Sequence, residues 1–315
     1  MNEVDKIVVC SRSFSKNETL RSILVNNYKY VKFNDEGSSL EGDNLSIFLE
    51  GQNKAIVGLE KIDAKLLSSL PELKVISKYG VGTDSLDLMA MQKHKIKLGW
   101  TPGINKRSVS ELVLCFSLLM LRLVPQANME VKNGGWNQYK GNQLTDKIFG
   151  IVGYGNIGRD LVDLIKPFNC RVLVFDVEKI QDSKNLGVEQ VSLEELLALS
   201  DIVSLHLPHN NQTNQLIDGA KLKLMKETSI LINLARGGIV NEIDLKIALK
   251  RNTIAAAAFD VFLQEPPEDE ELLNLPNFFA TPHIGGISQE AIKEMGMAAI
   301  RGLEENSFID LKSPT

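Results

Sequence analysis

The sequence has few cysteines, and their spacing fits none of the common cysteine-based sites. Among its 315 residues are three cysteines, Cys10, Cys115 and Cys170, far apart along the chain. An odd number of widely spaced cysteines forms neither a disulfide framework nor a CxxC metal-binding pair. We therefore expect no disulfide, no bound metal ion, and three small buried side chains kept reduced in the cytoplasm.

Long hydrophobic runs and blocks of one charge are also lacking. The longest apolar stretch, Leu112 to Val124, is interrupted by Ser117 and Arg122 and is shorter than the roughly 20 residues of a membrane-spanning helix. The N-terminus is charged early and then apolar over only four positions, which argues against a signal peptide. Basic residues number 35 and acidic residues 40, for a net charge of −5. Without a basic block, we expect no binding to nucleic acid or to an anionic membrane surface.

The residues that are present indicate a folded enzyme of about two domains. Apolar residues make up 43% of the chain, and short apolar segments alternate with amphipathic ones from end to end, without repeats or a flexible linker. Near-continuous apolar strands that alternate with helices predict a doubly wound parallel α/β fold. The expected strands are Val4–Cys10, Ala55–Leu59, Leu73–Ser77, Ile96–Trp100, Ile148–Val152, Val172–Phe175, Ile202–Leu205, Ile230–Leu234, Ala256–Phe259 and Phe278–Ala280.

Capping residues and turn residues mark several helices. Ser192 with Glu195 forms a capping-box pattern, and Ser288 is a plausible N-cap for a last helix over 289–305. A long helix is expected over Val109–Leu123, after the breaker Pro102-Gly103. Because that helix is apolar nearly all round, we expect it to be buried between domains or between subunits.

A glycine-rich turn follows one expected strand and leads into a helix. After Ile148–Val152 comes Gly153-Tyr-Gly-Asn-Ile-Gly158, the GxGxxG pattern. The first glycine permits the tight turn, Gly155 lets the backbone approach a pyrophosphate, and the last lets the helix pack on the strand. The free N–H groups and the positive dipole at the helix start would bind the phosphates of a dinucleotide.

An acidic residue stands where such a site needs one. The next expected strand, Val172–Phe175, ends at Asp176, 18 residues after Gly158. A carboxylate at this strand end accepts hydrogen bonds from the adenosine ribose and repels a 2′-phosphate. The turn and Asp176 together predict NAD, in preference to NADP, as the cofactor.

Four polar side chains follow other expected strands. Arg236, Asp260 and His283 each come shortly after a strand, and Glu265 lies a little beyond Asp260. Ligands of open α/β sheets bind outside the carboxyl ends of the strands. An arginine can hold a carboxylate with two hydrogen bonds, and a histidine beside a glutamate is a general acid/base near neutral pH. Spacing alone leaves open whether Arg236, Glu265 and His283 share one site or form a surface salt-bridge cluster.

The other histidines are less informative. His94 lies in a charged stretch and is expected at the surface. His206 and His209 flank Pro208 just after a strand, where they either line a cofactor pocket or face solvent.

Over essentially its whole length the chain resembles the D-isomer-specific 2-hydroxyacid dehydrogenase family. Four segments are similar to the family motifs GVGxDxxD, NxARG, DVFxxEP and LPNxxxTPHIGG, namely Gly80–Asp87, Asn233–Gly237, Asp260–Pro266 and Leu275–Gly286.

The resemblance implies catalytic roles for three residues. Arg236 would hold the carboxylate and the carbonyl of the substrate, and His283 would pass a proton to or from the C2 oxygen. Glu265 would hydrogen-bond His283 and favour its protonated form. The hydride chemistry itself belongs to the cofactor.

The resemblance also implies binding residues. Backbone N–H groups at Gly80, Val81 and Gly82 would form a small anion nest for the substrate carboxylate, beside Lys78. Asp260 would contact the nicotinamide carboxamide. The residues expected at NAD are Gly153, Tyr154, Gly155, Asn156, Ile157, Gly158, Asp176, His206, Pro208, Ala235, Arg236, Asp260, His283 and Gly285.

The family plan predicts two doubly wound domains. Residues 1–103 and 287–315 would form a flavodoxin-like substrate-binding domain, and residues 104–286 a Rossmann NAD-binding domain inserted into it. The helix over Val109–Leu123 would cross between them and help to form a two-fold homodimer.

Within the family, some segments are most similar to phosphoglycerate dehydrogenases, and the end at Thr315 leaves no room for a regulatory domain. These segments are Ser108–Leu112, Pro125–Ala127, Lys132–Trp136 and Gly141–Leu144. The resemblance predicts oxidation of D-3-phosphoglycerate to 3-phosphohydroxypyruvate. Lys78, Lys106 and Arg107 are candidates for the substrate phosphate, although each could be a solvated surface charge.

Two alternatives stay open at this point. One is a reductase of glyoxylate, hydroxypyruvate or another 2-oxo acid. The other is a non-catalytic NAD-sensing protein of the same fold, for which the sequence shows no partner motif.

Overall fold

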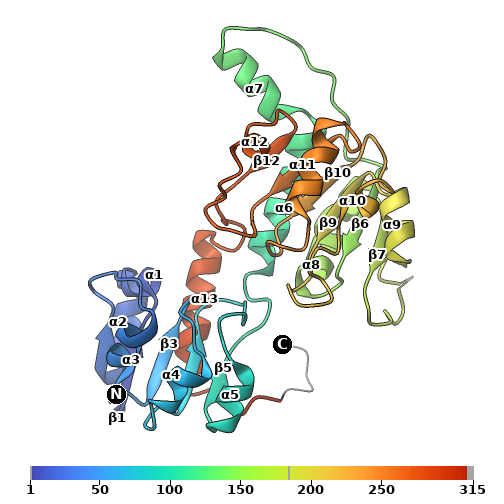
Figure 1. Ribbon diagram of the computed structural model, residues 1–315. Coiled ribbons are helices and arrows are strands. Elements are labelled where there is room, and N and C mark those ends of the chain that lie inside the picture. The colour runs from blue at the N-terminus through green and yellow to red at the C-terminus, as the bar shows by residue number, and fades with distance from the viewer. Residues whose placement is uncertain (1, 184, 311–315) are drawn as a thin grey trace. The chain divides into compact units, whose positions relative to one another are not determined.

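The chain builds two parallel β-sheets, each belonging to its own compact unit (Figure 1). The structure is a computed structural model that describes residues 2–183 and 185–310. Unit 1 comprises Met1–Asn105 and Gln289–Thr315, and unit 2 comprises Lys106–Ser288. Unit 2 is thus inserted into unit 1 along the sequence, with boundaries two residues from the expected ones.

Five strands form the sheet of unit 1, in the order β2-β1-β3-β4-β5. Every pairing is parallel, and β1 aligns Val8 with Lys32 of β2 on one side and with Ala55 of β3 on the other. The carboxyl ends of the strands therefore meet at one edge. The strands are β1 (Asn2–Val9), β2 (Tyr28–Phe33), β3 (Lys54–Val57), β4 (Val75–Lys78) and β5 (Lys97–Gly99).

Helices cover both faces of this sheet. They are α1 (Arg12–Ser15), α2 (Glu18–Asn27), α3 (Gly42–Leu49), α4 (Ala64–Ser68), α5 (Leu88–Lys93) and α13 (Gln289–Gly302). Side chains of α2 and α13, such as Leu24 and Ala299, pack around Ile7 on one face. Side chains of α3, α4 and α5 pack around Val8 on the other. Two hydrophobic cores follow from the alternation of side chains along β1.

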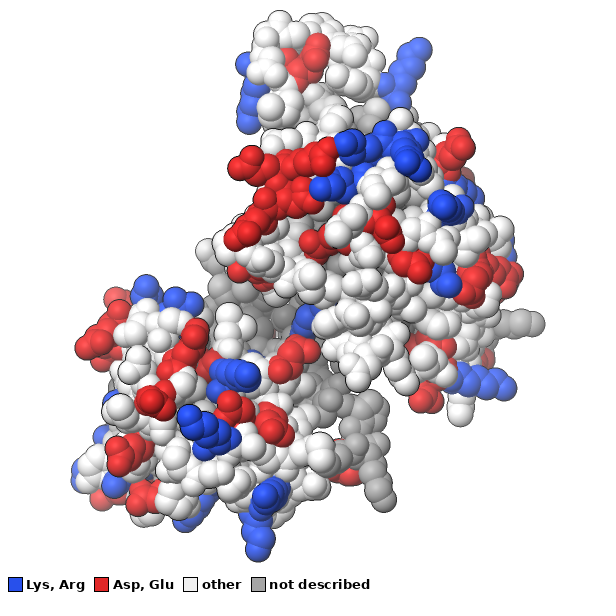
Figure 2. Space-filling model, viewed as in Figure 1, with Lys and Arg blue, Asp and Glu red and all other residues white. Residues whose placement is uncertain are grey.

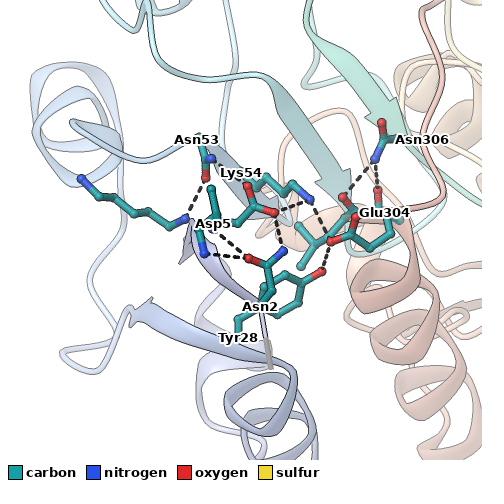
Figure 3. A network of polar contacts seen from close by, with 11 residues as sticks. Asn2, Asp5, Tyr28, Asn53, Lys54, Glu304 and Asn306 are labelled. Atoms are coloured by element: carbon teal, nitrogen blue, oxygen red, sulfur yellow. Dashed lines mark hydrogen bonds and ion pairs between the residues drawn. The ribbon is translucent and has the colours of Figure 1, made fainter.

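A polar network anchors the end of α13 to the strand starts of unit 1 (Figure 3). The ammonium group of Lys54 lies 2.9 Å from the carboxylates of both Asp5 and Glu304. The hydroxyl of Tyr28 donates to the same oxygen of Glu304, at 2.7 Å. Lys54 is 8% exposed, so its charge depends on these partners rather than on water.

Seven parallel strands form the sheet of unit 2, in the order β12-β11-β10-β9-β6-β7-β8. The chain starts at the centre with β6, moves outward to one side, and returns to fill the other side. This order places the switch point between β6 and β9, where ligands of open sheets bind. The strands are β6 (Ile148–Val152), β7 (Arg171–Phe175), β8 (Glu189–Gln190), β9 (Ile202–Leu205), β10 (Ile230–Asn233), β11 (Ala256–Phe259) and β12 (Phe278–Ala280).

Two hydrophobic cores also hold unit 2 together. Its helices are α6 (Lys106–Leu121), α7 (Val124–Lys132), α8 (Asn156–Ile165), α9 (Leu193–Leu199), α10 (Gly219–Leu222), α11 (Glu242–Lys250) and α12 (Glu270–Leu273), with a 3₁₀ turn over Lys166–Phe168. The helices α6 and α8 pack on one face of the sheet, around Ile151 and Ile232. The helices α9 to α12 pack on the other, around Val203 and Leu231. Several apolar side chains of α6, among them Val113 and Phe116, are thus buried within its own unit, against Phe149 and its neighbours.

The helix α7 stands apart from the rest of unit 2 (Figure 1). None of its residues is buried, and it exposes Met129 and Val131 by 56% and 54% of their surface. In the following loop, Trp136 is 79% exposed. Among the described residues no single helix is long and apolar enough to cross a membrane. Taken together, α6 and α7 have the length and apolar composition of a membrane span, but the two helices are bent by 63° relative to each other.

Charged side chains of both signs are mixed over the visible surface (Figure 2). On α11 and α12 they form an ion-pair network, in which Lys246 lies 2.7 Å from Asp269 and 3.2 Å from Glu271. Lys250 also pairs with Glu271.

The expected doubly wound parallel fold is confirmed, and every expected strand is present. Two strands were not expected from the sequence, and both lie at sheet edges. On β2 the residues Lys29, Tyr30 and Lys32 are exposed, so an edge strand breaks the continuous apolar pattern of the central strands. β8 has only two residues and carries no periodic signal.

Candidate functional site

The glycine-rich turn joins β6 to α8 at the centre of the unit 2 sheet. Gly153 has a φ of 98°, and a Cβ atom there would lie 2.5 Å from the carbonyl oxygen of His206. A Cβ atom on Gly158 would lie 2.5 Å from the oxygen of Gly153, so this glycine allows the helix to approach the strand. These two positions tolerate only glycine, for the reasons expected from the sequence.

Gly155 differs from the other two glycines because it adjoins open space. A Cβ atom there would meet nothing within 4 Å. Gly155 is also the N-cap of α8, and no side chain caps the free N–H groups of this helix. An open, uncapped helix start fits a phosphate group, which would accept hydrogen bonds from the backbone. The geometry of the turn therefore fits a dinucleotide phosphate. Tyr154 lies within this turn, and Asn156 and Ile157 begin α8.

Asp176 lies beside the glycine turn, at the end of β7. Its Oδ2 accepts a hydrogen bond from the N–H of Tyr154 at 2.7 Å, and its Oδ1 accepts one from the N–H of Glu178 at 3.0 Å. These bonds hold the carboxylate next to the turn while the residue stays partly exposed. The spacing in the sequence thus corresponds to a contact in space, as a ribose-binding carboxylate requires.

His206 lies against the glycine turn and is partly exposed, but Nδ1 of its ring is buried. Its Nε2 lies 3.0 Å from the hydroxyl of Ser204, while its Nδ1 is buried without a hydrogen-bond partner among the described residues. Burial lowers the pKa of His206 to about 3, because the charged imidazolium loses its hydration. The ring is therefore neutral under physiological conditions. The neighbouring Pro208 and His209 are exposed, and His209 lies 3.0 Å from the side-chain oxygen of Asn214.

Asn233 shapes the turn that carries Arg236 after β10. Its side-chain oxygen accepts from the N–H of Ala235 at 3.1 Å, and its amide donates to the carbonyl of Arg236 at 2.9 Å. The guanidinium of Arg236 donates to the carbonyl of Ala235 at 2.7 Å. Asn233 is 1% exposed and holds the backbone of this turn, whereas Arg236 is partly exposed.

The most direct candidate for proton transfer is the pair His283 and Glu265. Their side chains are 52% and 39% exposed, and Nδ1 of His283 lies 2.8 Å from Oε2 of Glu265. The other glutamate oxygen accepts from the N–H of Phe262 at 3.1 Å, which fixes the carboxylate. Because Nδ1 faces the glutamate, Nε2 is the nitrogen that can exchange a proton with a substrate.

Asp260, five residues before Glu265 in the sequence, holds the backbone turn around His283. It is 1% exposed, and its carboxylate accepts from the N–H groups of Ile284 and Gly285, both at 2.7 Å, and from the hydroxyl of Thr281. These three hydrogen-bond partners all belong to the segment around His283. The predicted contact with the nicotinamide carboxamide stays a prediction.

The residues predicted to bind the substrate lie in two different units. Gly80, Val81 and Gly82 follow β4 in unit 1, where Gly80 has a φ of 124° and the carbonyl of Val81 accepts from the indole N–H of Trp100 at 3.0 Å. Lys78 is 5% exposed, and its ammonium group donates to the carbonyl of Gly58.

The two other candidate cations lie in unit 2. Lys106 is exposed at the start of α6, and Arg107 pairs with the buried Asp160 of α8 at 3.0 Å. The structure thus gives Lys78 and Arg107 protein partners that the sequence did not reveal. Within the described part of the chain, no group of three or more His, Cys, Asp or Glu side chains is placed to hold a metal ion.

The sequence interpretation overlooked the side chains that hold the site loops. Asn233, Thr281 and Ser108 are examples, and all three hydrogen-bond to loops that carry site residues. Asn233 and Thr281 lie inside the recognised motifs, so their position was a usable signal. Ser108 begins the segment Ser108–Leu112, which resembles phosphoglycerate dehydrogenases, but no local pattern indicates its contact with Gly285, 177 residues further along the chain.

Comparison with known proteins agrees with this geometry. The model of the NAD-binding domain of D-isomer specific 2-hydroxyacid dehydrogenases matches residues 114–285. A glyoxylate reductase of Thermococcus litoralis is 35% identical over 254 residues, which are 78% of this chain and 77% of the relative. A D-3-phosphoglycerate dehydrogenase of Archaeoglobus fulgidus is 37% identical over 242 residues, which are 75% of this chain but 46% of the relative. This chain therefore spans about half the length of that relative.

A solved structure supports the fold over nearly the whole chain. The crystal structure of a D-lactate dehydrogenase from Aquifex aeolicus, complexed with NAD and lactic acid, superposes with a TM-score of 0.81 at 25% identity. The superposition covers 95% of this chain and 93% of that one.

Proposed function

The chain belongs to the D-isomer-specific 2-hydroxyacid dehydrogenase family, whose members are NAD-dependent enzymes, and on that premise we propose that Arg236, Glu265 and His283 interconvert a D-2-hydroxy acid and its 2-oxo acid. The observation that carries this proposal is the 2.8 Å contact between His283 and Glu265, at the sheet edge that also holds the glycine turn. A histidine oriented by a carboxylate is suited to proton transfer near neutral pH.

Each residue has a defined part in this proposal. During reduction, Nε2 of His283 donates a proton to the C2 oxygen, and Glu265 stabilises the imidazolium before the transfer. Arg236 binds the substrate carboxylate and polarises the carbonyl. NAD, when bound, supplies or accepts the hydride. The N–H groups at Gly80, Val81 and Gly82 bind the substrate carboxylate as well.

Different residues bind different parts of the dinucleotide. The uncapped start of α8 at Gly155 takes the pyrophosphate, and Asp176 accepts hydrogen bonds from the adenosine ribose. Pro208 borders the adenosine, and Ala235 and Gly285 lie on the loops expected to approach the nicotinamide. His206 supports the glycine turn, because its carbonyl oxygen contacts Gly153 and Nδ1 of its ring is buried.

The substrate proposed from the sequence is D-3-phosphoglycerate, oxidised to 3-phosphohydroxypyruvate. A phosphate needs cations, yet Lys78 already donates to Gly58 and Arg107 already pairs with Asp160. This observation favours the second candidate, a small unphosphorylated 2-oxo acid such as glyoxylate or hydroxypyruvate.

A substrate panel separates these candidates. Initial rates with NADH are measured for 3-phosphohydroxypyruvate, hydroxypyruvate and glyoxylate. A charge-assisted contact to phosphate contributes roughly 1.5–3 kcal/mol, so a phosphate-specific enzyme should show about 10- to 150-fold higher kcat/KM for the ester. Equal values for hydroxypyruvate and its ester would remove the phosphoglycerate assignment. Absence of turnover with every 2-oxo acid would favour an NAD-sensing protein.

We also propose that the protein forms a homodimer through α7 and the loop that follows it. Met129, Val131 and Trp136 lie close together in sequence and are each more than half exposed, and an interface that covers them removes this apolar surface from water. In this proposal α6 contributes less to the dimer interface than α7, because Val113 and Phe116 of α6 are buried in the core of unit 2 itself. The cytoplasmic location expected from the free cysteines stays a prediction.

A further inference from the structure

The turn that carries His283 adopts a backbone conformation that needs support. His283 has a φ of 56°, in the left-handed region that residues other than glycine rarely occupy. Such a conformation persists only where the surroundings hold it. The contacts that hold this turn therefore also determine where the imidazole lies.

Two side chains hold the turn at the same residue, Gly285. Asp260 accepts from its N–H at 2.7 Å, and the hydroxyl of Ser108 donates to its carbonyl at 2.7 Å. The same Ser108 oxygen accepts from the N–H of Ser288 at 3.3 Å, further along the turn. Both backbone polar groups of Gly285 are thus bound by side chains from elsewhere in unit 2.

Ser108 is itself fixed with respect to the dinucleotide-binding helix. It lies in the first turn of α6, next to Arg107, whose guanidinium is 3.0 Å from Asp160 on α8. In the same turn, the hydroxyl of Ser110 lies 3.4 Å from the carbonyl of Ile157, also on α8. The first turn of α6 therefore bridges the helix that starts at the glycine turn and the turn that carries His283.

We propose that Ser108 is a positioning residue, which holds His283 in register with the cofactor-binding helix for proton transfer. The proposal rests on the function proposed above. Ser108 does not touch the imidazole and acts through Gly285. Its hydroxyl is used twice, once as a donor and once as an acceptor, so alanine removes both contacts while threonine keeps them.

The test compares Ser108→Ala and Ser108→Thr with Ser117→Ala as a matched control. Ser117 lies on the same helix and is fully buried, but its hydroxyl bonds only to the carbonyl of Val113 within the helix. Ser108→Ala should lower kcat about 10- to 100-fold, because small displacements of a reacting group are costly. The Kd for NADH should stay within about twofold, since the contacts of the glycine turn remain. Ser108→Thr should recover most of the rate, and Ser117→Ala should match wild type.

Two further readouts separate positioning from a general loss of structure. In hydrogen exchange followed by mass spectrometry, without cofactor, the peptide covering residues 278–288 should exchange faster in Ser108→Ala alone. The pH–rate profile of Ser108→Ala should shift in the same direction as that of Glu265→Gln, because a displaced imidazole loses its carboxylate partner.

Different results would overturn the two proposals. Equal exchange of this peptide in Ser108→Ala and wild type would show that Ser108 does not hold the turn. Faster exchange with an unchanged kcat and pH profile would limit Ser108 to a structural role and overturn the inference. If wild type reduces no 2-oxo acid, the proposed function fails, and the exchange data still decide whether Ser108 holds the turn.

Discussion

Nδ1 of His283 lies 2.8 Å from Oε2 of Glu265, and the two residues come from loops that follow the neighbouring strands β12 and β11. This contact leads to the first prediction. In Glu265→Gln the amide no longer stabilises the imidazolium, which must donate the proton during reduction. The alkaline limb of the pH–rate profile for 2-oxo acid reduction should therefore move to lower pH. A profile identical to that of wild type would contradict the pairing.

The second prediction concerns His283 itself. His283→Ala should lower kcat by about 10²- to 10⁴-fold, the usual effect of removing a positioned acid/base. The Kd for NADH, measured by fluorescence, should change little, because the glycine turn is separate from the imidazole. Loss of NADH binding in this variant would mean that His283 acts mainly on the cofactor. His209→Ala is a useful control, since this exposed imidazole contacts Asn214.

The third prediction concerns the choice of cofactor. Asp176→Ala should lower kcat/KM with NAD and narrow the preference over NADP, because the carboxylate binds the ribose and repels a 2′-phosphate. Glu178→Ala removes a neighbouring exposed carboxylate and should leave the preference unchanged. A wild-type enzyme that prefers NADP would contradict the role of Asp176.

Inner strands such as β3, β4, β9, β10 and β11 are buried along their whole length, which makes their apolar pattern continuous and the strands predictable. The edge strand β2 lacks the continuous apolar pattern, since Lys29 and Lys32 face solvent. The glycine turn and the neighbouring Asp176 were also predictable, because strand ends in a parallel sheet meet at one edge.

Other features of the site depend on contacts that are distant in sequence. The position of His206 next to Pro208 does not reveal that Nδ1 of its ring is buried. Arg107 looked like a free cation until the structure placed the buried Asp160 beside it, 53 residues further along the chain. Pairings of this kind follow from helix packing, and local patterns do not contain them.

The fourth prediction concerns association. If α7 and its loop form the dimer interface, Val131→Asp should shift the sedimenting species from about 70 kDa toward the monomer mass of 34.9 kDa. A buried carboxylate without a partner is strongly unfavourable at an interface. The matched control is Ile47→Asp, which changes a similarly exposed residue on α3 of unit 1. A wild type that sediments only as a monomer at micromolar concentration would contradict the proposed homodimer.

The fifth prediction concerns the polar network around Lys54. Burial alone would raise the pKa of Asp5, but hydrogen bonds from Lys54, Asn53 and Asn2 outweigh it and lower this pKa. The network therefore stabilises the fold above the ordinary aspartate pKa, and this stabilisation is lost as pH falls through the lowered value. Lys54→Met should lower the free energy of unfolding by about 1–3 kcal/mol near pH 7.

Thermal unfolding at several pH values checks this prediction. The difference in Tm between wild type and Lys54→Met should be largest between about pH 5 and 9 and should shrink below about pH 4, where Asp5 becomes protonated. Lys166→Met is the control, because its pair with Asp163 is exposed and screened by water and should contribute little to stability. A difference that does not change with pH would show that Lys54 contributes through packing alone.

The contact between Ser108 and Ser288 has one more consequence, which concerns how such a chain can be rearranged. Unit 2 begins at Lys106 and ends at Ser288, so the 3.3 Å bond between these two serines brings its entry and exit within reach of each other. A segment whose two ends adjoin can be inserted into a host, excised from it, or rejoined through a short linker with new termini elsewhere, at little cost in loop-closure entropy.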